Sequence, residues 1–235
     1  MDSGASPRNH GFYARSGKRA VDLVVAACGL IALTPVFAIV ACCIKVTSRG
    51  PILYRQTRMG RDGHPFTILK FRSMAARISR QDPAITVAGD PRVTAIGRLL
   101  RHYKVDELPQ LWNVLRGDMS LVGPRPEVPI YLAQYTDEQR GVLSARPGIT
   151  DPASLAYRHE EELLAMHAEP ERFYRAQILP DKLARNLAYL SNISLRTDLR
   201  IILETVGSAF LGSKKDRDVP PVGITHTSSK SVSSV

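Results

Sequence analysis

The longest apolar stretch of the chain runs without a charged residue from Leu23 to Ile44. As a helix of 22 residues it would extend about 33 Å, close to the hydrocarbon thickness of a membrane. Pro35 removes one backbone hydrogen bond in the middle of this stretch, and the hydroxyl of Thr34 could return to a freed carbonyl. The pattern predicts a membrane segment that is broken at Thr34 and Pro35.

Basic residues flank this segment on both sides. They are Arg15, Lys18 and Arg19 before it, and Lys45 and Arg49 after it. Because positive charge marks the cytoplasmic side of membrane segments, these flanks favour neither direction of crossing, as expected if both ends are cytoplasmic. We therefore predict a re-entrant helix over residues 18–48, preceded by an N-terminal segment over residues 1–17. From these residues alone, a kinked helix that spans the membrane fits equally well.

Short strands are predicted at Ile52–Arg55 and Phe66–Phe71, joined by a turn at Gly60–Gly63. Farther along, apolar residues recur at helical spacing between Ile96 and Tyr103, with arginine and lysine between them. This second pattern fits a basic amphipathic helix in a bilayer interface. It fits a half-buried helix of a soluble domain about equally well.

Another helix is indicated by its end signals, with Asp106 as the cap, Pro109 in the first turn and Gly117 at the end. The apolar stripe between Leu199 and Phe210 is predicted to pack in the core. Together these elements predict an α+β fold, mostly helical with a small β-hairpin, in a monotopic membrane protein with interfacial amphipathic helices. We expect the folded domain to cover residues 49–212 and a disordered tail to cover residues 213–235.

Positive charge is concentrated directly after the apolar stretch. Residues 45–104 carry 13 basic and 3 acidic residues, whereas the whole chain carries 32 and 22. Such a block suits a phosphate-rich substrate, anionic lipid head groups or nucleic acid. No nucleic-acid motif or interleaved aromatic pattern accompanies it, so we expect no nucleic-acid partner. The three cysteines all lie in the apolar stretch, which excludes a disulfide scaffold.

Asp106 and Glu107 are the first candidates for chemistry, because they begin a predicted helix directly after the basic block. Backbone amides at a helix start stabilise a carboxylate, so Asp106 is expected to stay ionised and nucleophilic. A divalent metal ion held by these carboxylates and by phosphate oxygens would support attack on phosphorus. The commoner use of such a pair is a plain helix cap with a first-turn charge, and the two residues alone do not exclude it.

Four basic residues are candidates for phosphate binding. Arg125 lies in a rigid Pro-Arg-Pro frame, from which its guanidinium could hold a phosphate through two hydrogen bonds. Lys70, Arg72 and Arg101 are candidates for the same task. For each of them the alternative is an ordinary solvated charge.

Three longer motifs resemble one family. They read LYRQTRMGRDGHPFTILKFRSM at residues 53–74, KVDELPQLWNVLRGDMSLVGPRPE at residues 104–127 and RPGIT at residues 146–150. On these motifs the chain resembles the bacterial sugar transferases, the monotopic polyprenyl-phosphate phosphoglycosyl transferases, from about Lys18 to Phe210. The resemblance implies the small single-domain form, with a catalytic domain on the cytoplasmic face of the bacterial inner membrane.

The resemblance also implies a reaction. A sugar-1-phosphate would move from a UDP-sugar to undecaprenyl phosphate with release of UMP, in the presence of Mg²⁺, to initiate exopolysaccharide, capsule, O-antigen or glycoconjugate synthesis. Asp106 matches the nucleophile that forms a covalent aspartyl-phosphosugar, and Glu107 matches a partner that assists metal binding or accepts the acceptor's proton. Arg72, Arg101 and Arg125 match basic positions that hold phosphates, and Thr34-Pro35 matches the break of a re-entrant helix.

The chain departs from this pattern after RPGIT. Many relatives continue with a Gly-Trp-Ala-Gln-Val-type run, whereas Asp151–Glu162 contains no tryptophan and ends in three glutamates. We expect this region to contact the nucleotide or the sugar, so the identity of the UDP-sugar donor stays open, as does the oligomeric state. A catalytically idle membrane scaffold for a polysaccharide assembly complex is the alternative function.

Overall fold

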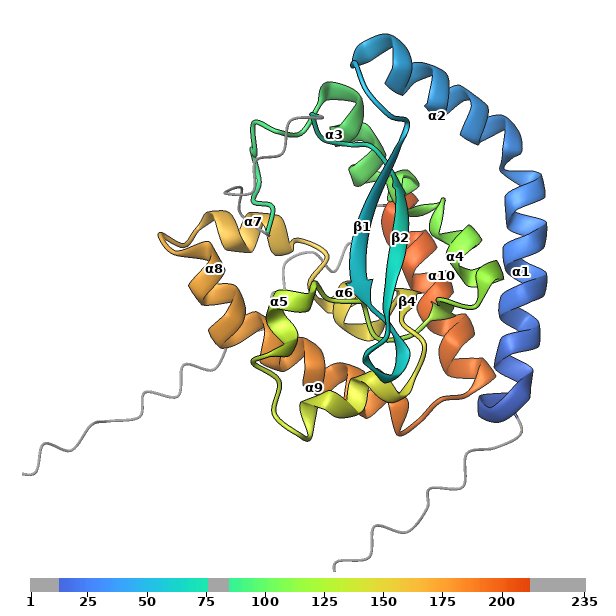
Figure 1. Cartoon of the computed structure of the whole chain (residues 1–235), viewed down its shortest axis with the longest axis vertical. Helices are drawn as coiled ribbons and strands as arrows, with labels where there is room; N and C mark the ends of the chain where they lie inside the picture. Colours follow the sequence, from blue (N-terminus) through green and yellow to red (C-terminus); the bar gives the residue numbers. More distant parts are fainter. Residues whose placement is uncertain (1–12, 76–84, 212–235) are drawn as a thin grey trace, which may run out of the picture.

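The computed structural model describes residues 13–75 and 85–211, which form a mostly helical fold with two small β-sheets (Figure 1). The predicted α+β class, with one β-hairpin among helices, is confirmed. The predicted tail over residues 213–235 and most of the predicted N-terminal segment lie outside the described residues.

The elements have the following bounds. The helices are α1 (Lys18–Ala32), α2 (Thr34–Thr47), α3 (Ala95–His102), α4 (Gln110–Arg116), α5 (Pro129–Leu132), α6 (Pro152–Ala156), α7 (Glu160–Ala165), α8 (Pro170–Phe173), α9 (Leu179–Leu190) and α10 (Leu195–Leu211). The strands are β1 (Leu53–Met59), β2 (Pro65–Phe71), β3 (Ser120–Val122) and β4 (Gly148–Thr150). Short 3₁₀ helices cover Arg61–Gly63, Val105–Glu107 and Gln139–Ser144, and π-helical segments cover Tyr13–Gly17 and Tyr174–Ile178.

The apolar stretch forms two helices that meet at a bend. α1 and α2 differ in direction by 60° and run along one edge of the molecule (Figure 1). The hydroxyl of Thr34 donates to the carbonyl of Leu30 at 2.9 Å, and Pro35 lies in the first turn of α2. The break predicted at Thr34 and Pro35 is therefore present. Within the described residues, no single helix is long and apolar enough to cross a membrane, although this bent pair passes the same length and composition test.

The predicted hairpin is longer than the sequence pattern indicated. β1 and β2 pair antiparallel from Leu53 opposite Phe71 to Met59 opposite Pro65. The turn between them has positive φ at Asp62 and Gly63 (55° and 76°). β3 and β4 form a second, parallel pair that sequence reasoning missed. All three residues of β3 are buried, so they carry no alternation of polar and apolar residues that would identify a strand.

The helices of the apolar stretch share cores with the rest of the fold. Ala26 of α1 packs in one cluster with Ile68 of β2 and with Leu111 and Val114 of α4. Ile44 near the end of α2 packs with Phe71 and Leu100 in another cluster. A third cluster joins α5 to the segment from α7 to α9. The bent pair is thus packed directly onto the elements that carry the candidate site.

The apolar stripe on α10 is placed differently from the prediction. Leu199, Leu203, Val206 and Phe210 are 53%, 61%, 52% and 66% exposed, whereas Ile201 is 2% exposed and packs in the core. The prediction that this stripe packs in the core is wrong for these four residues, and only its fifth member, Ile202, is partly buried against the core. α10 is apolar on two faces, and helical periodicity alone does not identify which face the rest of the chain covers.

α3 also has apolar residues on both a buried face and an exposed face. Leu100 is buried, whereas Leu99 is 53% exposed and Tyr103, directly after the helix, stacks on Phe210 of α10 at 5.9 Å between ring centroids. The exposed apolar residues of α3 and α10 therefore meet at this pair of rings.

Candidate active site

The candidate active site is built around a sharp reversal between α3 and α4. Lys104 adopts a left-handed conformation (φ 57°) that ends α3, and Asp106 and Glu107 follow in a 3₁₀ turn. Gly97 lets α3 approach the end of β2, because a β-carbon at this position would lie 1.9 Å from the carbonyl oxygen of Ser73. Asp106 and Glu107 are buried (6% and 8% exposed), and Glu107 forms an ion pair with Lys70 of β2.

Asp106 does not act as a helix cap. α4 begins only at Gln110, and the residue that precedes it is Pro109, so the predicted capping role of Asp106 is wrong. Its Oδ1 is buried and has no hydrogen-bond partner among the described residues. Burying a carboxylate oxygen without a partner is unfavourable, and such groups in native folds call for an explanation.

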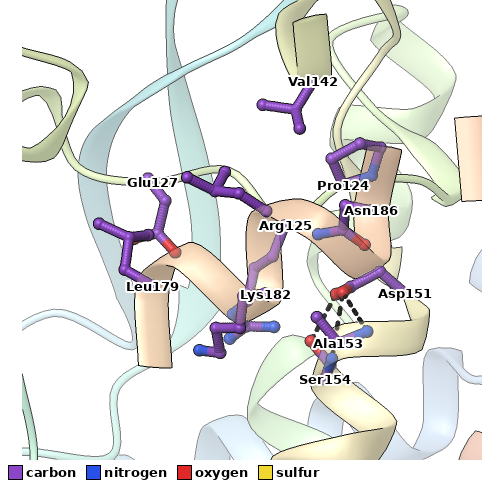
Figure 2. A pocket seen from close by; sticks show the side chains of 11 residues that line it. Pro124, Arg125, Glu127, Val142, Asp151, Ala153, Ser154, Leu179, Lys182 and Asn186 are labelled. Carbon is purple, nitrogen blue, oxygen red and sulfur yellow. Dashed lines mark hydrogen bonds between the residues drawn. The ribbon is translucent and has the colours of Figure 1, made fainter. Parts of the chain in front are cut away.

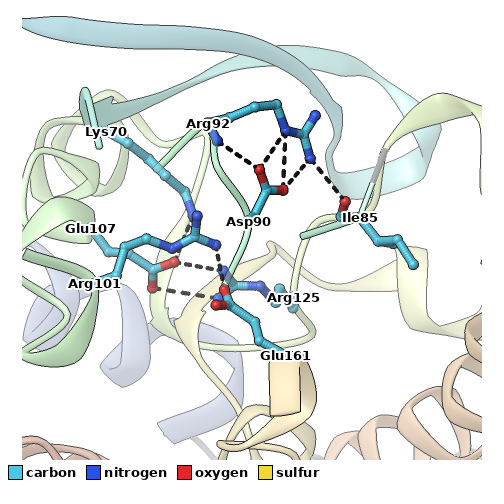
Figure 3. A network of polar contacts seen from close by, with 8 residues as sticks. All are labelled: Lys70, Ile85, Asp90, Arg92, Arg101, Glu107, Arg125 and Glu161. Carbon is cyan, nitrogen blue, oxygen red and sulfur yellow. Dashed lines mark hydrogen bonds and ion pairs between the residues drawn. The ribbon is translucent and has the colours of Figure 1, made fainter. Parts of the chain in front are cut away.

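Glu107 has the opposite surroundings. Lys70 of β2 donates to its Oε1 at 2.6 Å, and Arg125 donates to Oε1 at 2.6 Å and to Oε2 at 3.4 Å (Figure 3). Arg125 comes from the Gly-Pro-Arg-Pro segment, which is neither helix nor strand. The structure thus brings together Asp106, Glu107, Lys70 and Arg125, four of the six residues predicted to act in catalysis or phosphate binding.

The two carboxylates differ in acidity for physical reasons. Burial, and after it the charge of Glu107, raises the pKa of Asp106 to about 6, against the opposing charges of Lys70, Lys104 and Arg101. Burial alone would also raise the pKa of Glu107, but Arg125 and Lys70 hold it well below its usual value. The sequence predicted that helix amides would keep Asp106 ionised. In the structure, the positive charges of Lys70, Lys104 and Arg101 favour its ionised form instead.

Arg101 approaches the same cluster from α3. Its charge acts on Asp106, and its guanidinium forms an ion pair with Glu161 of α7 (Figure 3). Glu161 belongs to the acidic run that departs from the family pattern, and sequence reasoning gave it no partner. Spacing along the chain offered no signal for this pair, because its members are 60 residues apart.

Arg72 has partners elsewhere. It is 5% exposed and donates to the carbonyl oxygens of Ser48 and Arg49 at 2.8 and 2.9 Å, and to the hydroxyl of Ser48 at 2.7 Å. These bonds tie the chain just after α2 to the end of β2. Its predicted role in phosphate binding stays a prediction, and the contacts present here fix the bent helix pair to the hairpin.

Residues of α6 and α9 line a small cavity together with Arg125. A cavity of about 10 Å³, room for about one water molecule, is lined by Arg125, Asp151, Lys182 and Asn186 among others (Figure 2). Asp151 caps α6 by accepting from the amides of Ala153 and Ser154 at 2.8 and 3.0 Å. This part of Asp151–Glu162 therefore packs next to Arg125.

The described residues contain no group of three or more His, Cys, Asp or Glu side chains that could hold a metal ion. The site does offer the unpartnered Oδ1 of Asp106, whereas both oxygens of Glu107 accept hydrogen bonds. Mg²⁺ is commonly bound by one or two carboxylates together with substrate phosphates and water. The donor set therefore fits a metal ion that arrives with a phosphate-bearing substrate.

Comparison with known proteins gives a consistent result. The family model for bacterial sugar transferases matches residues 13–212. The UDP-glucose:undecaprenyl-phosphate glucose-1-phosphate transferase of Caulobacter vibrioides is 41% identical over 194 residues, which cover 81% of this chain and 68% of the relative. The transferase of the same name from Escherichia coli is 37% identical over 200 residues, covering 83% of this chain and 40% of the relative.

A third relative is the exopolysaccharide production protein ExoY of Sinorhizobium fredii, 34% identical over 209 residues, which cover 83% of this chain and 85% of the relative. The chain therefore spans less than half of the Escherichia coli relative but most of ExoY. The predicted family and enzyme class are confirmed, and the chain belongs to the bacterial sugar transferases.

Proposed function

We propose that the protein transfers a sugar-1-phosphate from a UDP-sugar to undecaprenyl phosphate, with Asp106 as the nucleophile. The observation that carries this proposal is the buried, unpartnered Oδ1 of Asp106 beside a cluster of cations. The names of the relatives supply the donor and the acceptor, since two of them are UDP-glucose:undecaprenyl-phosphate glucose-1-phosphate transferases.

The reaction takes place in two displacements at one phosphorus atom. In the first, a carboxylate oxygen of Asp106 bonds to the sugar-linked phosphorus, and the bond to the bridging oxygen breaks so that UMP leaves with the electron pair. In the second, a phosphate oxygen of undecaprenyl phosphate bonds to the same phosphorus and the carboxylate of Asp106 leaves. One phosphoanhydride replaces another, so positioning and charge stabilisation supply the catalysis.

The neighbouring residues have supporting roles in this proposal. Lys70, Arg101 and Arg125 would stabilise the phosphates of both substrates, and Glu107 would hold Lys70 and Arg125 in place. Because its pKa is held low and both its oxygens accept hydrogen bonds, Glu107 suits this positioning role better than that of a proton acceptor. Mg²⁺, held by Asp106 and the donor phosphates, would neutralise charge on the leaving UMP.

Membrane attachment is part of the same proposal. We infer that α1 and α2 form a re-entrant helix pair at the cytoplasmic face of the bacterial inner membrane, supported by their 60° bend and by exposed Val24, Ile31 and Ile39 (63%, 77% and 64%). The exposed apolar faces of α3 and α10 would lie in the interface and hold the site at the depth of the acceptor's phosphate.

The test of the activity is UMP release from a panel of UDP-sugars, with undecaprenyl phosphate and Mg²⁺, in detergent or nanodiscs. We expect release from at least one donor and its loss when Mg²⁺ is removed with a chelator. No release from any UDP-sugar would contradict the proposal and favour a catalytically idle scaffold for polysaccharide assembly. The panel also identifies the donor sugar.

The test of the topology is labelling of single cysteines introduced at Ser16 and Ser48, on either side of the bent pair, in a variant whose native cysteines are replaced by serine. A re-entrant pair predicts that a membrane-impermeant reagent labels both positions only from the cytoplasmic side. Labelling of one position from the periplasmic side would show that the segment spans the membrane.

A further inference from the structure

Four basic side chains act by charge on the two carboxylates of the site, and they are Lys70, Arg101, Lys104 and Arg125. Three of them already have an anionic partner. Glu107 pairs with Lys70 and Arg125, and Glu161 pairs with Arg101. Lys104 forms no ion pair with any of the described residues 13–75 and 85–211. Its ammonium group is therefore the cation of this cluster that no carboxylate of the described chain occupies.

The backbone of Lys104 is unusual as well. Its φ of 57° and ψ of 18° lie in the left-handed region, which glycine adopts with less strain than lysine. Its amide donates to the carbonyl of Arg101 at 3.1 Å, and its carbonyl accepts from the amide of Glu107 at 3.2 Å. The residue is exposed, so its side chain adds little packing that would offset the strain. Such strain beside a reactive group points to a task for the side chain in function.

Lys104 lies where the polar site meets an exposed apolar surface. Tyr103, the residue before it, is 37% exposed and stacks on Phe210 of α10, which is 66% exposed. Two residues after it comes Asp106, whose ionised form the charge of Lys104 favours. Of the two substrates in the proposed reaction, undecaprenyl phosphate alone carries a long apolar chain beside its phosphate. A cation at the edge of an apolar surface therefore suits the lipid acceptor better than the UDP-sugar.

We propose that the ammonium group of Lys104 binds the phosphate of undecaprenyl phosphate and directs it toward Asp106. The inference rests on the proposed function and deepens it, because it assigns one cation to the acceptor. Since Lys104 has no anionic partner among the described residues, the incoming phosphate has no internal ion pair to break there. A compact charge with three donors on a flexible stem suits a phosphate that arrives and leaves in every turnover.

The test uses Lys104→Gln, which removes the charge and keeps a polar side chain. We expect KM for undecaprenyl phosphate to rise about 10-fold, because a charge-assisted contact is lost. KM for the UDP-sugar should change by less than about twofold. The assay is run at about pH 8.5, where Asp106, with a pKa of about 6, stays ionised even if loss of a nearby cation raises that pKa.

The two displacements can also be measured separately. With the UDP-sugar alone, Lys104→Gln should form the sugar-phosphate adduct on Asp106 at the wild-type rate, because the acceptor takes no part in that step. Added undecaprenyl phosphate below its KM should then remove the adduct about 10-fold more slowly than in the wild type. Equal slowing of both displacements would show a general disturbance of the site and would overturn the inference.

Two further variants separate the charge from the turn and from the membrane surface. Lys104→Gly relieves the left-handed strain, so its Tm should stay equal or rise while its acceptor KM rises as in Lys104→Gln. Lys45→Gln makes the same change at an exposed lysine in the last turn of α2, and should change the acceptor KM by less than about twofold.

A normal acceptor KM in either Lys104 variant, or an equal rise in Lys45→Gln, overturns the inference. Absence of UMP release by the wild-type protein would instead contradict the proposed function, so the two failures are distinguishable.

Discussion

Asp106 and Glu107 are adjacent in the chain, yet their surroundings are opposite. Glu107 accepts hydrogen bonds from Lys70 and Arg125 on both of its oxygens. Asp106 keeps one buried oxygen without any partner among the described residues, and its pKa is raised by burial. The comparison teaches that one carboxylate organises the cations of the site, while the other is left free to react. The predictions that follow separate these two roles.

The largest effect is expected from Asp106→Asn. The amide has nearly the same shape but is not nucleophilic, so UMP release should fall by more than about 1,000-fold. The free energy of unfolding should stay equal or rise, because a buried charge is removed. Parallel measurements of turnover and thermal unfolding check both parts, and near-normal turnover would contradict the assignment of the nucleophile.

A smaller loss of activity, with a clear loss of stability, is expected from Glu107→Gln. The change leaves Lys70 and Arg125 without their anion, which should lower the free energy of unfolding by about 3 kcal/mol and reduce turnover through misplaced cations. Glu169→Gln is the matched control, because Glu169 forms a solvent-exposed ion pair with Arg172. Its loss should lower the free energy of unfolding by less than about 0.5 kcal/mol. Equal stability changes in the two variants would refute the organising role of Glu107.

The smallest effect is expected from Glu161→Gln, which releases Arg101 from its partner on α7. Both side chains are partly exposed (44% and 24%), so stability should change by less than about 1 kcal/mol. If Arg101 binds a donor phosphate, removing its competitor should lower KM for the UDP-sugar by about 1.5- to 5-fold. A higher KM would show that Glu161 instead positions Arg101 for its task.

The sequence predicted the parts of this architecture that have local signals. Pro35 marked the helix break, and Gly60–Gly63 marked the turn of the hairpin. Gly117 also marked the end of α4, where it adopts φ 94°. These features depend on the conformational limits of proline and glycine, which act within a few residues.

What the sequence did not reveal depends on tertiary packing. Asp106 looked like a helix cap, but the left-handed Lys104 turns the chain so that Asp106 lies in a buried 3₁₀ turn instead. The pairing of Arg101 with Glu161, and the exposed face of α10 at Leu203, likewise depend on which elements pack together.

The central claim is that Asp106 bonds directly to phosphorus, and intact-protein and peptide mass spectrometry tests it most directly. The protein is incubated with its UDP-sugar donor and Mg²⁺ without undecaprenyl phosphate, then denatured rapidly. The account predicts a mass increase equal to one sugar phosphate, located on Asp106 and lost when undecaprenyl phosphate is added before denaturation. An adduct on another residue, or no adduct at any time in a protein that turns over with both substrates, would contradict it.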